Sequence, residues 1–231
     1  MPMYVALPAG GVPRPAVLVI HGIDGLAGAT QDAADQFAAR GYVAAAPDLF
    51  HRGPPPTTFA EMSKRRWAHT DLQTTCDLDA AIAHLQAQPF VEAGPMGIIG
   101  FCMGGRVAYH MATTNPLLAL AVDCYGGNVL HGEGGDAPID HTADIRCPVL
   151  VLDGEENHNP PPSDVRAIEA ALAQHGIVHE VQLYPGVGHG FMGGTLTPQG
   201  KDAWSRVWEW FGRYLETAPN DFVETHVRRV H

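Results

Sequence analysis

Cys102 stands in a sequence context that suits a catalytic nucleophile. The run Gly-Phe-Cys-Met-Gly-Gly at 100–105 follows a short apolar run, 96–99, and precedes a segment of helical character, 106–114. A nucleophile in a sharp turn between strand and helix needs neighbours almost without side chains two residues before and after it, and glycines stand at both places. The turn also puts the thiol at a helix N-terminus, where the helix dipole favours the thiolate. We expect attack on a carbonyl carbon; the alternative is a buried cysteine in a glycine-rich packing turn.

His189 is the candidate base. A thiol nucleophile needs a base that takes its proton during attack. Among the 13 histidines of the chain, His189 follows the last predicted strand directly and lies between Gly188 and Gly190. The flanking glycines give the backbone the freedom to carry the imidazole back over the sheet.

Three acidic residues are candidates for the group that orients this base. Asp153, Glu155 and Glu156 all follow the predicted strand at 148–152. We favour Glu156, which lies past the strand end and four residues before Pro160, and we keep the other two as alternatives. Any of the three would hold the imidazole tautomer and stabilise the imidazolium that forms in the reaction.

The oxyanion of a tetrahedral intermediate needs two hydrogen-bond donors. We expect these to be the backbone N–H of Met103, directly after the nucleophile, and that of Ile23, in the first loop between strand and helix. Gly22 and Gly25 give this loop the freedom to turn an amide inward. The alternative is that His21 and Gly22 form an ordinary turn.

Strands that alternate with helices must position these groups. The run at 17–20 is continuously apolar rather than alternating, as in a strand that is covered on both faces. The pattern predicts a mostly parallel, doubly wound α/β sheet with helices on both faces. We expect strands at 17–20, 42–46, 96–99, 118–125, 148–152 and 178–184, and helices at 30–40, 59–88 with a break near Thr70, 106–114, 163–175 and 201–215. We expect the polar, glycine-rich segment 126–145 to be a long loop between two strands.

The candidate residues all follow predicted strands. Cys102, the loop 21–24, the acids at 153–156 and the loop 186–189 each come directly after an apolar run. Ligands of doubly wound sheets bind at the carboxyl ends of the strands. The sequence therefore predicts that these four segments meet at one edge of the sheet.

Size and charge restrict the classes of protein and partner. The chain has 231 residues, 45% of them hydrophobic, and a net charge of −11. This length suits a single domain over 1–231 with one core. The negative charge argues against nucleic acid or an anionic membrane as partner. The N-terminus lacks a basic segment followed by an apolar one, and no apolar run approaches 18 residues, so we expect a cytoplasmic protein.

The four cysteines lack the spacing of a metal site. No two of them form a C-x-x-C pair, and we expect neither a metal nor a disulfide. Cys76, Cys124 and Cys147 fall in or near predicted elements, so we expect each of them to be a small buried hydrophobe.

Taken together, these motifs resemble the dienelactone hydrolase (carboxymethylenebutenolidase) family of α/β-hydrolases. The likeness spans nearly the whole chain and includes Pro47-Asp48-Leu49, the run 77–82, the cysteine turn with its double glycine, Tyr125-Gly126 and Gly188-His189-Gly190-Phe191. It implies an α/β-hydrolase fold in which nucleophile, acid and base follow in that chain order.

The resemblance also implies roles for individual residues. Cys102 would be the nucleophile, His189 the base and Glu156 the acid, where the family usually has Asp. The amides of Ile23 and Met103 would form the oxyanion hole. Trp67 and Tyr125 match pocket residues of the family, and we also expect Asp24 and Phe191 to contact substrate.

The chain departs from the family at three positions. Gly22 stands where the family member that opens dienelactones has a glutamate that helps to activate the thiol, and Asp24 is the nearest acid. Two arginines that hold a substrate carboxylate are replaced by Gly193 and Ala60. Lys64, Arg65 and Arg66 lie nearby, and we expect them on the solvated face of a helix.

These observations predict a hydrolase that cleaves an ester or lactone through a cysteine thioester, which water then hydrolyses. We expect no metal or organic cofactor, a small-molecule ester or lactone as the partner, and a monomer or small homo-oligomer. One alternative is a hydrolase of neutral esters or thioesters, which the missing arginines favour. Another is a binding or sensing protein of low turnover with the same pocket. The tail 220–231 is expected to cover the body or a neighbouring molecule.

Overall fold

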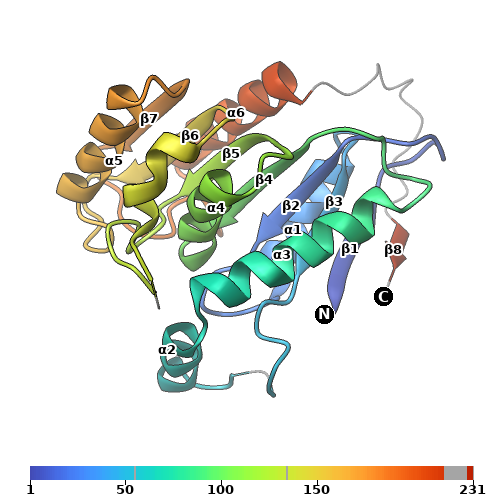
Figure 1. The fold of residues 1–231 in the computed structure, drawn as a ribbon, viewed down its shortest axis with the longest axis horizontal. Coiled ribbons are helices and arrows are strands. Elements are labelled where there is room, and N and C mark those ends of the chain that lie inside the picture. The colour runs from blue at the N-terminus through green and yellow to red at the C-terminus, as the bar shows by residue number, and fades with distance from the viewer. Residues whose placement is uncertain (55, 134, 216–227, 231) are drawn as a thin grey trace.

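The computed structural model describes residues 1–54, 56–133, 135–215 and 228–230, and these form one eight-stranded sheet flanked by helices (Figure 1). The strand order is β7-β6-β5-β4-β2-β3-β1-β8. The strands are β1 (Met3–Leu7), β2 (Ala16–Ile20), β3 (Val43–Pro47), β4 (Met96–Phe101), β5 (Leu118–Cys124), β6 (Val149–Gly154), β7 (His179–Tyr184) and β8 (Arg228–Val230). The helices are α1 (Gly28–Ala38), α2 (Phe59–Ala68), α3 (Asp71–Gln86), α4 (Met103–Thr114), α5 (Pro162–Gln174), α6 (Pro198–Tyr214) and the 3₁₀ helix η1 (Pro138–Asp144).

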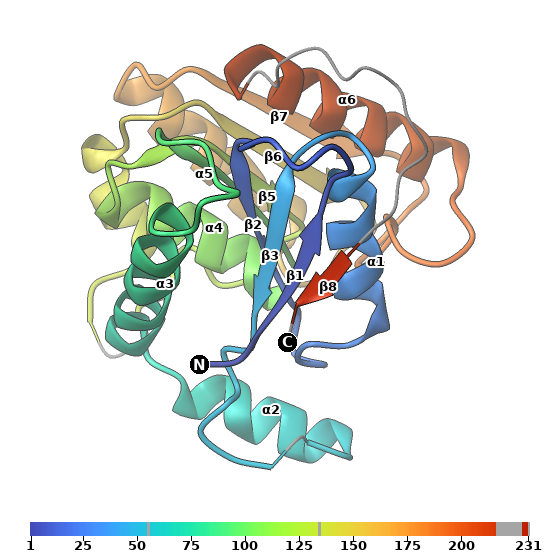
Figure 2. The same ribbon diagram turned by 90° about the vertical axis from the view of Figure 1, so that its right-hand side faces the viewer.

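The sheet is mostly parallel, as the sequence predicts. Strands β2 to β7 pair in parallel, while β1 is antiparallel to β3, and β8 is antiparallel to β1. Figure 2 shows α3 and α4 on one face of the sheet and α1 and α6 on the other. All residues of β2 are buried, because a strand covered on both faces has no solvated side.

Each face of the sheet has its own hydrophobic core. On one face, Leu18 and Ile98 pack with side chains of α3, α4 and α5. On the other, Val19 and Ile99 pack with α1 and α6, where Phe37 and Phe211 meet edge to face at 4.7 Å. The central strands therefore sit at fixed positions, and so do the loops that follow them.

The helical segment 59–88 breaks at Thr70, as predicted. Thr70 caps α3: its hydroxyl accepts from the N–H of Gln73, and the Gln73 side chain accepts from the N–H of Thr70. This reciprocal capping satisfies two donors that would otherwise lack partners and fixes where the second helix begins. The chain before it forms α2, which protrudes from the body in both views (Figures 1 and 2).

Four features differ from the sequence expectations or extend them: strand β1, the helix η1, the exposure of Cys76 and strand β8. Strand β1 was not expected, and the segment 126–145 contains the 3₁₀ helix η1. Cys124 and Cys147 are buried as expected, but the expectation for Cys76 is wrong, because it lies on an exposed face of α3. Of the tail, β8 pairs with β1 at the sheet edge; 216–227 and 231 lie outside the described residues. No described helix has the length and apolar character to span a membrane.

Candidate active site

Cys102 occupies a strained turn between β4 and α4. Its backbone has φ 57° and ψ −119°, a region that costs free energy for any residue with a Cβ. The turn is too crowded for side chains on either side: a Cβ at Gly100 would lie 1.8 Å from the Gly104 carbonyl oxygen, and one at Gly104 would lie 2.3 Å from the Ile20 carbonyl oxygen. The two glycines are therefore sterically required, and the surrounding contacts hold the thiol in place.

Two backbone amides converge on this thiol. Burial raises the pKa of Cys102, and hydrogen bonds from the N–H groups of Met103 and Ile23 oppose that effect. Asp24 raises the pKa further, and Arg66 lowers it. The net direction is upward, so the resting group is a neutral thiol. The same two N–H groups that the sequence suggests as oxyanion donors thus meet at the Cys102 sulfur.

His189 lines the same two cavities as Cys102. Partial burial lowers the pKa of its imidazole, while a hydrogen bond to the backbone carbonyl of Asn159 raises it. The net direction is downward, so the ring is neutral at pH 7 and has a nitrogen free to accept a proton. Tyr125 packs edge to face against it, with ring centroids 5.1 Å apart. The ring is thus both oriented and in the protonation state that a general base requires.

The three candidate acids have different surroundings. Glu156 lines the same cavity as Cys102 and His189, and its carboxylate is exposed. Asp153 is fully buried and accepts from the Gly154 N–H and the Asn157 amide instead. Within the described part of the chain, no carboxylate forms an ion pair with His189. Its ring is held by a backbone carbonyl in this structure. Of the three candidate acids, Glu156 is the one that lines a cavity together with Cys102 and His189, whereas Asp153 and Glu155 line neither cavity.

Two cavities meet at Cys102 and share Ile23 and His189 as well. The first, which we name the α2-side cavity, has a volume of about 460 Å³. The second, the α1-side cavity, has a volume of about 560 Å³. A substrate whose carbonyl carbon lay at the Cys102 sulfur would extend one substituent of that carbonyl into each cavity.

The predicted substrate contacts divide between these cavities. Trp67 lines the α2-side cavity, and Asp24 and Tyr125 line the α1-side cavity. Phe191 lines neither; it packs behind Tyr125, with ring centroids 5.8 Å apart. Other α1-side residues are Thr30, Asp32, Phe101, Met192, Leu196 and Trp204.

The expectation that Arg66 is solvated is wrong. Arg66 is only 6% exposed, lines the α2-side cavity and forms a two-pronged ion pair with Glu133. Glu133 also faces Arg106, which is paired with Asp71. This network of four charges connects α2 to α4, the helix that follows Cys102. The local sequence carries no signal for it, because Glu133 lies 67 residues from Arg66.

Three metal-binding side chains do not come together anywhere among the described residues. The groups present at the site are capable of nucleophilic attack by a thiol, proton transfer by an imidazole and stabilisation of an oxyanion by two amides.

Comparisons with known proteins agree with this architecture. The Pyrococcus horikoshii acylaminoacyl peptidase has a TM-score of 0.77 over 96% of this chain and 40% of its own, at 16% identity, which shows a shared fold. A Klebsiella pneumoniae structure titled "Putative Dienelactone Hydrolase" has a TM-score of 0.86 at 30% identity and covers 93% of both chains. A "Putative carboxymethylenebutenolidase" of Methylorubrum extorquens is 31% identical over 229 residues, which are 93% of this chain and 77% of that protein.

The fold, together with the strained turn at Cys102 between β4 and α4, defines a hydrolase with the α/β-hydrolase fold. A family model described as "Dienelactone hydrolase family" matches residues 1–215. The chain belongs to the dienelactone hydrolase family.

Proposed function

We propose that this protein hydrolyses esters or lactones through a thioester on Cys102. The observation that carries the proposal is that the amides of Met103 and Ile23 donate to the Cys102 sulfur, while the neutral imidazole of His189 lines the same two cavities as that sulfur. A merely structural cysteine has no need of two donors and a base around it.

The first half of the reaction would form the thioester. His189 accepts the thiol proton as the sulfur attacks the carbonyl carbon, so that the neutral pair becomes a tetrahedral intermediate and an imidazolium. The carbonyl oxygen takes the place that the sulfur holds against the amides of Ile23 and Met103, and its negative charge is stabilised there. The imidazolium then gives its proton to the departing alkoxide, and the carbon–oxygen bond breaks.

The second half would release the acid. His189 takes a proton from water, the hydroxide attacks the thioester carbonyl, and the same two amides bind the second oxyanion. The sulfur leaves and recovers its proton from the imidazolium. We propose Glu156 as the acid that stabilises this imidazolium, since it lines the cavity while Asp153 is engaged with Gly154 and Asn157.

The charges around the cleft favour a neutral substrate, which makes a hydrolase of neutral esters or thioesters the second candidate. The cation on the wall of the α2-side cavity, Arg66, is already neutralised by Glu133. Two carboxylates, Asp24 and Asp32, line the α1-side cavity. A substrate carboxylate would therefore meet an occupied guanidinium on one side and two acids on the other.

The test is hydrolysis of p-nitrophenyl acetate and of a dienelactone by the wild type, Cys102→Ala, His189→Ala and Cys76→Ala. We expect Cys102→Ala to abolish turnover and His189→Ala to reduce it by at least a thousandfold, on the scale of other nucleophile and base deletions. Cys76→Ala is the matched control, because Cys76 is an exposed cysteine outside both cavities. Unchanged turnover in Cys102→Ala would rule out the mechanism. Turnover of the simple ester alone would favour the neutral-substrate candidate.

A further inference from the structure

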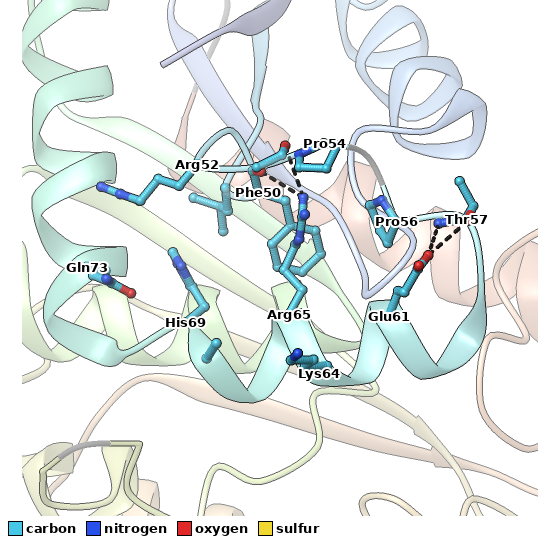
Figure 3. Close-up of a pocket in the computed structure, with 13 residues that line it drawn as sticks. Phe50, Arg52, Pro54, Pro56, Thr57, Glu61, Lys64, Arg65, His69 and Gln73 are labelled. Carbon is cyan, nitrogen blue, oxygen red and sulfur yellow. Dashed lines mark hydrogen bonds between the residues drawn. The ribbon is translucent and has the colours of Figure 1, made fainter.

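A third cavity, of about 620 Å³, lies between α2 and the chain around Phe50 and Pro54 (Figure 3). Residues 59, 63, 66 and 67 of α2 line the α2-side cavity, whereas 61, 64, 65 and 68 line this one. These two sets occupy opposite faces of a helix that turns by about 100° per residue. We name it the rear cavity; its apolar walls are Leu49, Phe50, Pro54, Pro56 and Ala68.

The wall of the rear cavity carries more cations than anions. Neither Lys64 nor Arg65 forms an ion pair with any carboxylate in the described ranges. Arg52 is paired with Asp77, and the carboxylate of Glu61 accepts from Thr57 and Thr58 at the start of α2. In a chain with a net charge of −11, a concave surface where Lys64 and Arg65 stand against the single carboxylate of Glu61 among the described lining residues keeps a local positive charge.

Arg65 is held in place with donors to spare. One terminal nitrogen donates to the Phe50 carbonyl at 3.1 Å and the Gly53 carbonyl at 3.3 Å, and the guanidinium carbon lies 5.8 Å from the Phe50 ring centroid. Figure 3 shows this side chain reaching from α2 to the Phe50–Pro54 segment. The remaining N–H groups, on Nε and the second terminal nitrogen, have no acceptor in the described structure. A fixed guanidinium with free donors matches a carboxylate or phosphate.

His69 supplies an independent sign of a missing ligand. It lines the rear cavity, is only 8% exposed, and its buried Nε2 has no hydrogen-bond partner. Buried polar atoms are normally paired, because an unpaired one loses its hydration without compensation. Burial lowers the pKa of this imidazole to about 4, so the ring is neutral and Nε2 needs a hydrogen-bond partner rather than a counter-charge.

We propose that the rear cavity binds a small organic anion: a carboxylate or a phosphate monoester carried on an apolar or aromatic body. Arg65 and Lys64 bind the anion, the walls around Phe50 and Pro54 contact the body, and His69 Nε2 contributes a hydrogen bond. The site contains neither Cys102 nor His189, so it does not depend on the proposed reaction.

The test is calorimetric titration of the wild type with benzoate, phenyl phosphate and neutral benzamide. We expect one-to-one binding of at least one anion, and binding of benzamide at least tenfold weaker. The tighter of the two anions identifies whether the site takes a carboxylate or a phosphate. Cys102→Ala should bind like the wild type, so failure of the proposed catalysis and failure of this site give different results.

Substitutions of the two cations test whether the anion binds in the rear cavity. Arg65→Gln and Lys64→Gln should each weaken anion binding at least tenfold. Arg146→Gln is the matched control, because one terminal nitrogen of Arg146 also donates to two backbone carbonyls, those of Ala143 and Ile145, away from the rear cavity. Arg65→Gln could disturb the segment it holds, but Lys64 makes no hydrogen bond recorded in the described structure, so Lys64→Gln removes charge alone. Absence of anion binding, equal binding of benzamide, or wild-type affinity in both variants would overturn the proposal.

Discussion

At the scale of single residues, the resting site holds a neutral thiol and a neutral imidazole on the walls of the same two cavities. The pKa of Cys102 is raised above its ordinary value of 9.0 mainly by burial, and that of His189 is lowered mainly by burial. The dipole of a helix N-terminus, which favours a thiolate, is therefore outweighed by desolvation. In the proposed reaction, the proton would therefore leave the sulfur during attack, when charge moves onto an oxygen held by two amides, and not before it.

The protonation states give a prediction for alkylation. The rate at which iodoacetamide modifies Cys102 should rise with pH until above pH 9, because the thiolate reacts and burial holds its pKa above that value. Mass spectrometry of the peptide that contains Cys102, with the peptide that contains exposed Cys76 as internal reference, measures this profile. A reactive plateau extending down to about pH 5 would instead indicate a resting thiolate–imidazolium pair.

A second residue-scale prediction concerns two buried acids. Burial raises the pKa of Asp123 to about 7 and that of Asp153 to about 6, and each is buried with at most 1% exposure. Their pKa values in the unfolded chain are about 3.9. The folded state therefore binds protons more tightly, and stability falls as pH rises from about 4 through the folded pKa values. Asp153 Oδ2 also lacks a partner.

Asp123→Asn should therefore stabilise the protein, and more so at high pH. The amide oxygen can still accept from the Gly126 N–H, as Asp123 does at 2.8 Å, while the ionisation is removed. We expect a gain on the order of 1–2 kcal/mol at pH 8 that shrinks towards pH 4. Urea unfolding at both pH values measures it, with Asp32→Asn, an acid outside the core, as the control. A gain of equal size at both pH values would contradict the linkage.

At the scale of elements, α2 separates two cavities while packing little against the core. Arg66 is its one buried residue, whereas Phe59 and Trp67, on the wall of the α2-side cavity, are 74% and 63% exposed. Arg66 ties one face of the helix to Glu133, and Arg65 ties the other to the Phe50–Gly53 segment. Ion pairs and backbone hydrogen bonds thus hold this wall of the cleft, rather than hydrophobic burial.

Removing the Glu133 carboxylate should loosen α2. Glu133→Gln leaves Arg66 and Arg106 buried with one fewer counter-charge, a change that typically costs about 3–5 kcal/mol. We expect KM to rise at least fivefold and limited proteolysis to cleave faster near α2, with a smaller change in kcat. Arg206→Gln, on α6, removes the ion pairs with Glu180 and Asp202, which are one-third exposed or more, and each such pair should contribute less than about 1 kcal/mol. Equal effects of the two variants would show that the network does not position α2.

The parts of the fold that the sequence predicts are those with local causes. Thr70 indicates the start of α3 because capping depends on residues three apart. The glycines around Cys102 indicate the sharp turn between β4 and α4 because the crowding that requires them is local. Strand β1 escaped prediction because its place depends on pairing with β3, about 40 residues away. The burial of Arg66 escaped for the same reason, since its cause is the distant Glu133.

At the scale of the whole molecule, charge should select the substrate. The net charge of −11 repels anions over distances of roughly a Debye length, about 10 Å at 0.1 M salt. Within the cleft, Arg66 is neutralised and Asp24 and Asp32 line one side. Both effects oppose an ester whose acyl part carries a carboxylate, such as p-nitrophenyl succinate, relative to neutral p-nitrophenyl acetate.

Gly193→Arg should reverse part of this preference. Gly193 lines the α1-side cavity at the position where the family has a carboxylate-binding arginine. A Cβ there would meet no atom closer than 3.6 Å, and the backbone does not require glycine. We expect kcat/KM for the succinate ester to rise at least tenfold, with little change for the acetate, because a guanidinium forms paired hydrogen bonds with a carboxylate. Gly193→Gln, which adds a side chain without charge, should not do this. An equal gain for both esters, or for both variants, would mean that the arginine acts by filling the cavity and that charge does not set the preference.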